Sequence, residues 1–175
     1  MRLQIARFNW YLFSQPVIRH GISSLTFSRC VVYIDDLGQK FPSFLERFQQ
    51  RVLENDFPQE DVLQTFRDLL TDMYQFWDPI PGNCITISAM EFINGCVLEQ
   101  MLAIRDMKLS DAGQSWPYFL RNKTGASGAY AFMLFPKHLN IDLSVYIQVI
   151  EDIVLVTNLV NDILSYVSLS IFLLT

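Results

Sequence analysis

The chain has 175 residues and a formal net charge of −5, and 51% of its residues are hydrophobic, 14% aromatic and only 18% charged. This composition excludes an intrinsically disordered protein, because disordered chains are poor in aromatic residues and rich in charge. The acidic balance argues against a general nucleic-acid-binding protein, which needs a basic surface to displace counterions.

Hydrophobic periodicity predicts helices along nearly the whole chain. In chain order, the predicted helices cover residues 25–34, residues 44–53, a segment that opens at residues 58–61 and is ended by residues 79–82, residues 85–103, a short segment that begins at residue 116 and is broken at residues 124–128, and residues 143–166. The helix that opens near residue 58 carries an apolar stripe made of Val62, Leu63, Phe66, Leu69, Leu70, Met73 and Phe76.

The segment 143–166 is the longest predicted helix, and it is apolar almost all round. Such a helix is expected inside a bundle rather than at its edge. Strict alternation of polar and apolar residues is absent, and the apolar runs are longer than typical strands. The sequence therefore predicts an all-α protein, one domain or part of one, with long helices around an aromatic-rich centre.

Asp35 and Asp36 follow an apolar stretch at the predicted end of the first helix. Adjacent carboxylates supply the hard oxygen ligands that Mg²⁺ prefers. A solvated helix end is the ordinary alternative, although two carboxylates at a helix C-terminus oppose the helix dipole. This conflict favours a functional reason for the pair.

Asn161, Asp162 and Ser165 interrupt the most apolar helix. Asn161 and Ser165 are four residues apart, so they share one helix face. Two interpretations remain open, a hydrogen-bonded pair between helices and a second Mg²⁺ site that faces Asp35 and Asp36.

Arg121 follows a short aromatic run, and its planar guanidinium is suited to phosphate. A solvated side chain is the alternative for Arg121 and for Lys123. Six aromatic residues are expected in the core, where some could turn ring faces toward a carbocation: Phe76, Trp77, Phe92, Tyr130, Phe132 and Phe135.

The three cysteines and two histidines form no recognisable metal or disulfide motif. Cys30, Cys84 and Cys96 contain no CxxC pair, which favours reduced thiols and a cytoplasmic protein. His20 and His138 are far apart in the sequence, so a zinc enzyme has no support. Residues 167–175 are apolar but too short to span a bilayer.

Several blocks together resemble the fungal trichodiene synthase family of class I sesquiterpene cyclases. The resemblance runs from about residue 25 to residue 166. It rests on the acidic pair at 35–36 and on the segments 89–100 (AMEFINGCVLEQ), 116–121 (WPYFLR), 135–137 (FPK) and 159–166 (LVNDILSY), which stand in the family's order.

The resemblance implies a class I terpenoid-synthase helical bundle, three Mg²⁺ ions and farnesyl diphosphate as the substrate. Asp35, Asp36, Asn161 and Ser165 would be metal ligands, and Arg121 would be the catalytic, diphosphate-sensing arginine. Phe92, Gly125 and Gly128 are expected to line the substrate pocket. No nucleic acid and no stable membrane insertion are expected, and a homodimer is left open.

Three departures from the family stand out. Gly38, Gln39 and Lys40 occupy the place of a further acidic residue. Ser168 and Leu169 occupy the places of a basic residue and of a glutamate ligand, and leucine cannot bind Mg²⁺. The family's helices before and after this segment, with a C-terminal arginine–tyrosine pair, are expected to be missing, so the bundle is predicted to be incomplete.

The match is lost abruptly after Tyr166, where VSLSIFLLT follows. We therefore divide the chain into a partial cyclase domain, residues 1–166, and an apolar tail outside the family pattern, residues 167–175. Because GTGAGT can encode Val-Ser and resembles an intron start, we hypothesise that the tail is translated intron. The DNA at codons 167–168 tests this hypothesis, which a sequence unlike a splice donor would exclude.

Three functions follow from these patterns. The first is a sesquiterpene cyclase, for which the 175-residue chain itself is expected to show little or no turnover. The second is a non-catalytic helical protein of cyclase ancestry. The third is a helical protein that associates with membranes through residues 167–175.

Overall fold

The structure, a computed structural model, describes the backbone of residues 16–56 and 60–174 and the side chains of residues 19–56 and 60–164. Over these ranges the regular elements are all helices, with no strand. The α-helices are α2 (Pro16–Leu37), α3 (Pro42–Glu46), α4 (Phe48–Glu54), α5 (Asp61–Phe76), α6 (Pro79–Gln100), α7 (Leu102–Arg105), α8 (Trp116–Thr124), α9 (Ser127–Met133), α10 (Leu143–Tyr146) and α11 (Ile150–Leu174). The all-α prediction is confirmed.

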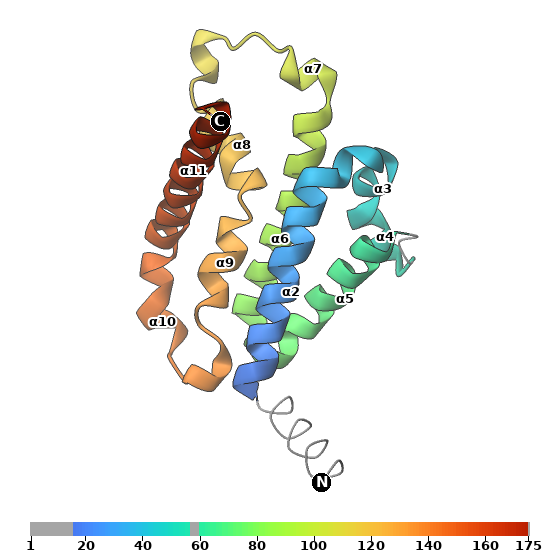
Figure 1. Ribbon diagram of the computed structural model, residues 1–175. Coiled ribbons are helices and arrows are strands. Elements are labelled where there is room, and N and C mark those ends of the chain that lie inside the picture. Colours follow the sequence, from blue (N-terminus) through green and yellow to red (C-terminus); the bar gives the residue numbers. More distant parts are fainter. Residues whose placement is uncertain (1–15, 57–59, 175) are drawn as a thin grey trace.

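Helix α6 is the central element of the bundle (Figure 1). It contacts α5 on one side and the α8–α9 pair on the other, and α2 packs along α5. Helix α11 packs on α9, at the side of the bundle away from α5. This arrangement brings residues near 35, 92, 121 and 161 toward one region of the molecule, although they are far apart in the sequence.

The core is apolar and rich in aromatic side chains, as the sequence predicts. Every residue of the predicted α5 stripe except Val62 is buried, and Val62 is partly buried against the same cluster. The ring of Phe66 lies between those of Phe27 and Phe48, at centroid distances of 5.3 and 5.9 Å. Offset and tilted aromatic pairs of this kind stabilise a core beyond the area that they bury.

Several predicted helix boundaries are wrong, among them the start of the first helix, which begins at Pro16 and not at residue 25. Helix α2 continues to Leu37, so Asp35 and Asp36 lie inside its last turn rather than beyond its end. The segment Pro79–Gly82 opens α6 and does not end α5, which already stops at Phe76. Proline fits the first turn of a helix, where its missing N–H has no intrahelical partner to lose.

The predicted helix at residues 44–53 is divided at Arg47 into α3 and α4. The helix predicted at 143–166 is likewise divided, because a 3₁₀ turn at Ile147–Val149 separates α10 from α11.

Helix α11 is not enclosed as its composition predicts. Its covered face includes the buried Ile150 and Asn158, whereas the opposite face exposes Leu155, Val156, Leu159, Val160, Ile163 and Leu164. By length and composition, residues Leu143–Leu164 could cross a membrane, a test that the core helix of a soluble protein also passes. The expectation of a central helix is therefore wrong for the described side chains of α11, residues 150–164, of which only one face is covered.

Candidate functional site

A cavity of about 380 Å³ lies where α2, α6, α8, α9 and α11 meet. We call it the front cavity. It is lined by Val31, Val32, Asp35, Phe92, Arg121, Thr124, Gly125, Tyr130, Thr157 and Asn161. Its walls are mostly apolar, and its charged lining residues are one acid and one base. A predominantly apolar pocket with a few convergent polar groups is the usual form of a small-molecule site.

The front cavity brings together five of the residues predicted from the sequence. Asp35, Phe92, Arg121, Gly125 and Asn161 come from four helices and one interhelical break, and all of them line it.

Three other predicted residues do not join this group. Asp36 lines a groove on another face of α2, and Gly128 lines a different cavity, described below. The side chain of Ser165 lies outside the described residues.

Asp35 is held in an environment that disfavours its negative charge. Partial burial raises its pKa, the nearby Asp36 raises it further, and the Arg121 guanidinium lowers it. Glu99 shows the same pattern, since burial and the charge of Asp35 raise its pKa and Arg121 lowers it. Carboxylates that are desolvated beside one another are stabilised by a nearby cation. Arg121 is the cation that plays this part for Asp35 and Glu99.

Arg121 is held in place by α11. Its Nε donates a hydrogen bond to Asp162 Oδ1 at 2.8 Å, and its Nη2 donates to the backbone oxygen of Asn158 at 3.2 Å. Asn158 is only 6% exposed, and its Nδ2 donates to Asn122 Oδ1 at 3.1 Å. Arg121 is thus an anchored side chain rather than a freely solvated one, and its guanidinium contributes to the cavity wall.

The break between α8 and α9 allows this close approach. Ala126 adopts a left-handed conformation with φ 47°, which ends α8 and redirects the chain into α9. A Cβ atom on Gly125 would lie 2.5 Å from Asn158 Oδ1 and 2.6 Å from Arg121 Nη1. Real Cβ atoms do not approach other atoms so closely, so the hydrogen-bonded arrangement of Arg121 and α11 needs glycine at position 125.

The donor atoms of the front cavity suit Mg²⁺ in kind but are few. Asp35 and Asn161 offer hard oxygen ligands, and Mg²⁺ commonly completes its shell with water and phosphate oxygens. In the described part of the chain, no group of three or more His, Cys, Asp or Glu side chains is close enough to hold a metal alone. His20 and His138 do come together, with ring centroids 5.5 Å apart, but as a pair only. A metal ion held by Asp35 and Asn161 would therefore need further oxygen atoms from water or from the phosphate groups of a bound substrate.

Two residues near the site escaped the sequence analysis. Glu99 lies inside a segment recognised for its resemblance, but nothing in its spacing indicates that it faces Asp35. Asn158 is an amide in an apolar helix, one turn before Asn161, and it bonds to α8 in the role considered for Asn161 and Ser165. Its three-residue spacing from Asn161 could have pointed to Asn158.

The aromatic residues divide as expected between core and cavity. Phe92 and Tyr130 line the front cavity, and the Tyr130 ring meets Phe27 edge to face at 5.8 Å. Phe76, Trp77 and Phe132 are buried, and Phe135 stacks on Tyr146 at 4.2 Å.

Comparisons with known proteins identify the family of this chain. Residues 4–169 match the family described as trichodiene synthase. Terpene synthase BipA of Cochliobolus sativus is 28% identical over 140 residues, which cover 80% of this chain and 43% of that protein. An (E)-beta farnesene synthase of Metarhizium brunneum is 29% identical over 164 residues, covering 92% and 49% of the two chains. Alpha-cuprenene synthase of Coprinopsis cinerea is 28% identical, covering 81% and 42%.

The chain spans about half the length of the curated relatives that it matches. The family match extends from residue 4 to residue 169, so it includes Asp35, Arg121 and Asn161 and ends within the predicted tail. The extent of this match, together with the all-α bundle, identifies the chain as a member of the trichodiene synthase family of terpene synthases.

Proposed function

We propose that this chain carries the diphosphate-binding and metal-binding part of a sesquiterpene cyclase that acts on farnesyl diphosphate. The observation that supports the proposal is the convergence of Asp35, Arg121 and Asn161 on one cavity with apolar walls. These residues come from α2, α8 and α11, and a few polar groups that converge in a mostly apolar cavity are the usual form of a small-molecule site.

Each of these side chains has a distinct role in the proposal. Asp35 and Asn161 would hold Mg²⁺ through their oxygen atoms, with Asp36 and Ser165 as the further ligands that the resemblance implies. Arg121 would bind the diphosphate through its fork of N–H donors, which matches phosphate oxygens. Bound Mg²⁺ would neutralise the charge that develops on departing diphosphate.

The rest of the cavity would protect the hydrocarbon part of the substrate. The rings of Phe92 and Tyr130 can turn electron-rich faces toward an allylic cation. Val31, Val32 and Thr157 would help to exclude water, which would otherwise quench the cation. Ring closure with release of diphosphate is the reaction class that such a lining supports.

We further propose that the 175-residue chain by itself gives little or no turnover. Leu169 stands where the family has a glutamate ligand, and α11 leaves one apolar face uncovered. Fewer groups would hold the diphosphate, and the cavity would be open to water on one side. Binding without release of product is therefore the expected behaviour of the isolated chain.

Asp35 and Asp36 provide a matched pair for the test. Binding of farnesyl diphosphate to the 175-residue chain is measured by calorimetry with Mg²⁺ and with EDTA. We expect Mg²⁺-dependent binding that Asp35→Asn weakens strongly and Asp36→Asn weakens less, because Asp36 lines a different groove. Gas chromatography of an extract then reports whether any sesquiterpene is released.

Absence of Mg²⁺-dependent binding would contradict the proposed site and would favour the non-catalytic function. Release of a sesquiterpene by the 175-residue chain would contradict the expected inactivity but not the site. If the chain floats with phosphatidylcholine vesicles and does not bind farnesyl diphosphate, the third function, a membrane-associated protein, would be favoured.

A further inference from the structure

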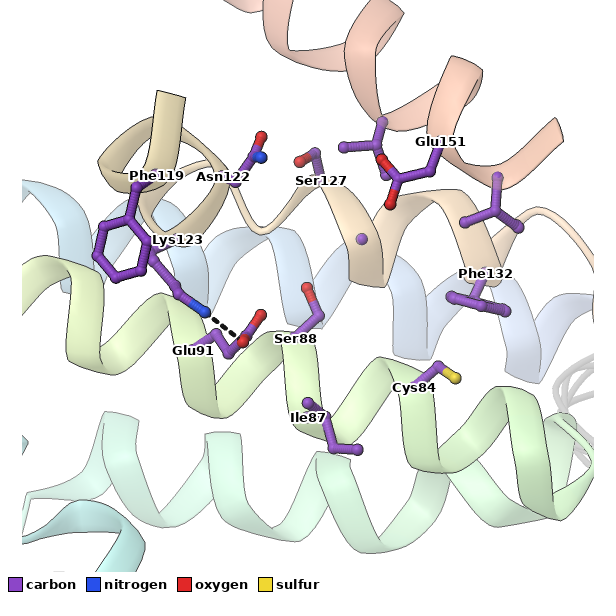
Figure 2. Close-up of a pocket in the computed structure, with 13 residues that line it drawn as sticks. Cys84, Ile87, Ser88, Glu91, Phe119, Asn122, Lys123, Ser127, Phe132 and Glu151 are labelled. Atoms are coloured by element: carbon purple, nitrogen blue, oxygen red, sulfur yellow. Dashed lines mark hydrogen bonds and ion pairs between the residues drawn. The ribbon is translucent and has the colours of Figure 1, made fainter. Parts of the chain in front are cut away.

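A second cavity, of about 390 Å³, lies between α6, α8, α9 and α11 (Figure 2). We call it the rear cavity. It shares the α8–α9 segment with the front cavity but no lining residue. It is lined by Cys84, Ile87, Ser88, Glu91, Phe119, Asn122, Lys123, Ser127, Gly128, Phe132, Ile150, Glu151 and Val154. The roles proposed above for Asp35, Arg121 and Asn161 leave this cavity without a function.

Ser127 is the polar group in the rear cavity that lacks a partner. The residue is 0% exposed, and its Oγ has no hydrogen-bond partner among the described residues. Burial of an unpaired hydroxyl is unfavourable, so such groups usually meet a ligand or an ordered water. Ser127 belongs to the cavity lining, so its unpaired hydroxyl is a buried group there that an occupant would satisfy.

Ser88 adds a second hydroxyl, fixed in position by the backbone. Its Oγ accepts a hydrogen bond from the Ala129 N–H at 2.9 Å, and Figure 2 shows it pointing from α6 toward α9. A Cβ atom on Gly128 would lie only 2.9 Å from this oxygen, so glycine there permits the close approach of the two helices. As an acceptor from Ala129, Ser88 still has its own hydrogen to donate.

The charges at the rear cavity are already balanced or repel anions. Lys123 Nζ pairs with Glu91 Oε1, and the ammonium also lies 5.4 Å from the centre of the Phe119 ring. Glu151 adds a further negative charge from α11. A diphosphate or a carboxylate would be repelled by Glu151, and Lys123 is already paired and cannot offset this repulsion. A neutral molecule would meet no such repulsion.

The remaining walls are hydrophobic. Ile87, Phe132, Ile150 and Val154 give the cavity a lining in which water finds few hydrogen-bond partners. One or two waters could bond to Ser127, but they would leave the hydrophobic part of the lining without contacts. A ligand with an apolar body and one polar atom satisfies both features together.

We propose that the rear cavity binds a compact, neutral apolar molecule with a single hydroxyl group, which bonds to Ser127 Oγ. A hydroxyl is the chemistry that fits because it can both accept from and donate to the serine hydroxyls. The cavity volume lies within the range of small-molecule sites and suits a body of about 10 to 15 carbon atoms. The proposal does not depend on diphosphate binding at the front cavity.

Cys84 gives a readout that is local to this cavity. It is the most accessible of the three cysteines, since Cys30 and Cys96 are buried. Borneol is used as the probe, and camphane, which has the same bicyclic body without the hydroxyl, is the control. Saturating borneol is expected to slow maleimide alkylation of Cys84 about fivefold or more in the 175-residue chain, and Cys84→Ser identifies the signal.

Ser127→Ala tests the hydrogen bond itself. Loss of one buried hydrogen bond is expected to weaken borneol binding about 3- to 10-fold, measured by calorimetry. The variant should fold, because the hydroxyl that it removes has no partner within the described residues. Its melting temperature is compared with that of the parent chain to check this.

Three results would overturn the proposal. They are unchanged borneol affinity in Ser127→Ala, alkylation of Cys84 at the same rate with and without borneol, and equal protection by camphane at matched concentration. Diphosphate is absent from these measurements, so their failure would leave the proposed function at the front cavity untouched.

Discussion

The front and rear cavities are nearly equal in volume, about 380 and 390 Å³, yet they differ in charge. The front cavity holds Asp35 and Arg121, which come from separate helices and do not bond to each other in the described contacts. The rear cavity holds Lys123 and Glu91 as a closed ion pair. Positions 121, 124 and 125 face the front and positions 119, 122 and 123 face the rear. Each face of this short helix thus carries a base that is paired with an acid, but at the rear both partners line the cavity, whereas in front Arg121 pairs with Asp162, which is outside the lining, and not with Asp35.

The largest expected effect is on the binding of an anion at the front cavity. Arg121→Ala should weaken Mg²⁺-dependent pyrophosphate binding about 10- to 150-fold, because hydrogen bonds to charged groups contribute about 1.5–3 kcal/mol. Arg105→Ala, in α7 and away from both cavities, is the control and should bind pyrophosphate like the parent chain. Calorimetric titration with pyrophosphate and Mg²⁺ measures both. Equal losses in the two variants would remove Arg121 from the site.

The next effect concerns the wall that the cavities share. Gly125→Ala should lower the free energy of unfolding by about 1–3 kcal/mol, because the added Cβ overlaps Asn158 and Arg121 and forces them apart. Gly21→Ala is the matched control, since a Cβ there meets nothing within 4 Å. Urea unfolding followed by circular dichroism compares the two. A Gly125→Ala chain as stable as the parent would show that the break is not tightly packed.

A smaller effect tests the desolvated acid of the front cavity through pH. The folded state raises the pKa of Asp35 above its ordinary value of 3.8, mainly by burial, so the folded chain binds more protons than the unfolded chain just above that pH. The stability contributed by Asp35 therefore falls as pH rises through this window. Without metal, Asp35→Asn should raise the melting temperature at pH 7 and not at pH 3. An equal change at both pH values would argue against a charge effect.

The smallest expected effect lies in the rear cavity. Lys123→Met removes an ion pair whose partners are partly exposed, with side-chain exposures of 24% and 43%. Exposed pairs contribute about 0.2–1 kcal/mol, so the free energy of unfolding should fall by less than about 1 kcal/mol. The difference should shrink in 1 M NaCl, which screens the charges. A loss that high salt leaves unchanged would assign the effect to packing against Phe119 instead.

Much of the fold could be predicted from the sequence because helix periodicity carries it. The α5 stripe is buried as expected, and the convergence of Asp35, Arg121 and Asn161 follows from the family resemblance. The faces of helices were harder to place. Asp36 and Gly128 are each close in sequence to residues of the front cavity, but they line other hollows. Adjacent residues such as Asp35 and Asp36 face different directions on a helix, and Gly128 lies beyond the left-handed break at Ala126.

Interactions between distant elements were beyond the sequence. The acid pair of Asp35 and Glu99 and the bond from Asn158 to Asn122 depend on how α2, α6, α8 and α11 cross. Helix α11 is a further example. Its apolar composition indicates burial on all sides, but it does not identify the element that packs against each side. Calorimetry of the Asp35 and Asp36 variants measures how differently these two neighbouring residues of α2 contribute to the front cavity.

The break at Gly125 and Ala126 has a consequence for how this chain can evolve. Thr124 and Gly125 line the front cavity, and Ser127 and Gly128, beyond the break, line the rear cavity, so a substitution that shifts this segment to reshape one hollow also displaces the wall of the other. A backbone shift selected at the proposed substrate site in front would therefore carry a correlated change at the rear. We therefore expect residues 121–128 to diversify more slowly than the exposed face of α11, where no second constraint applies.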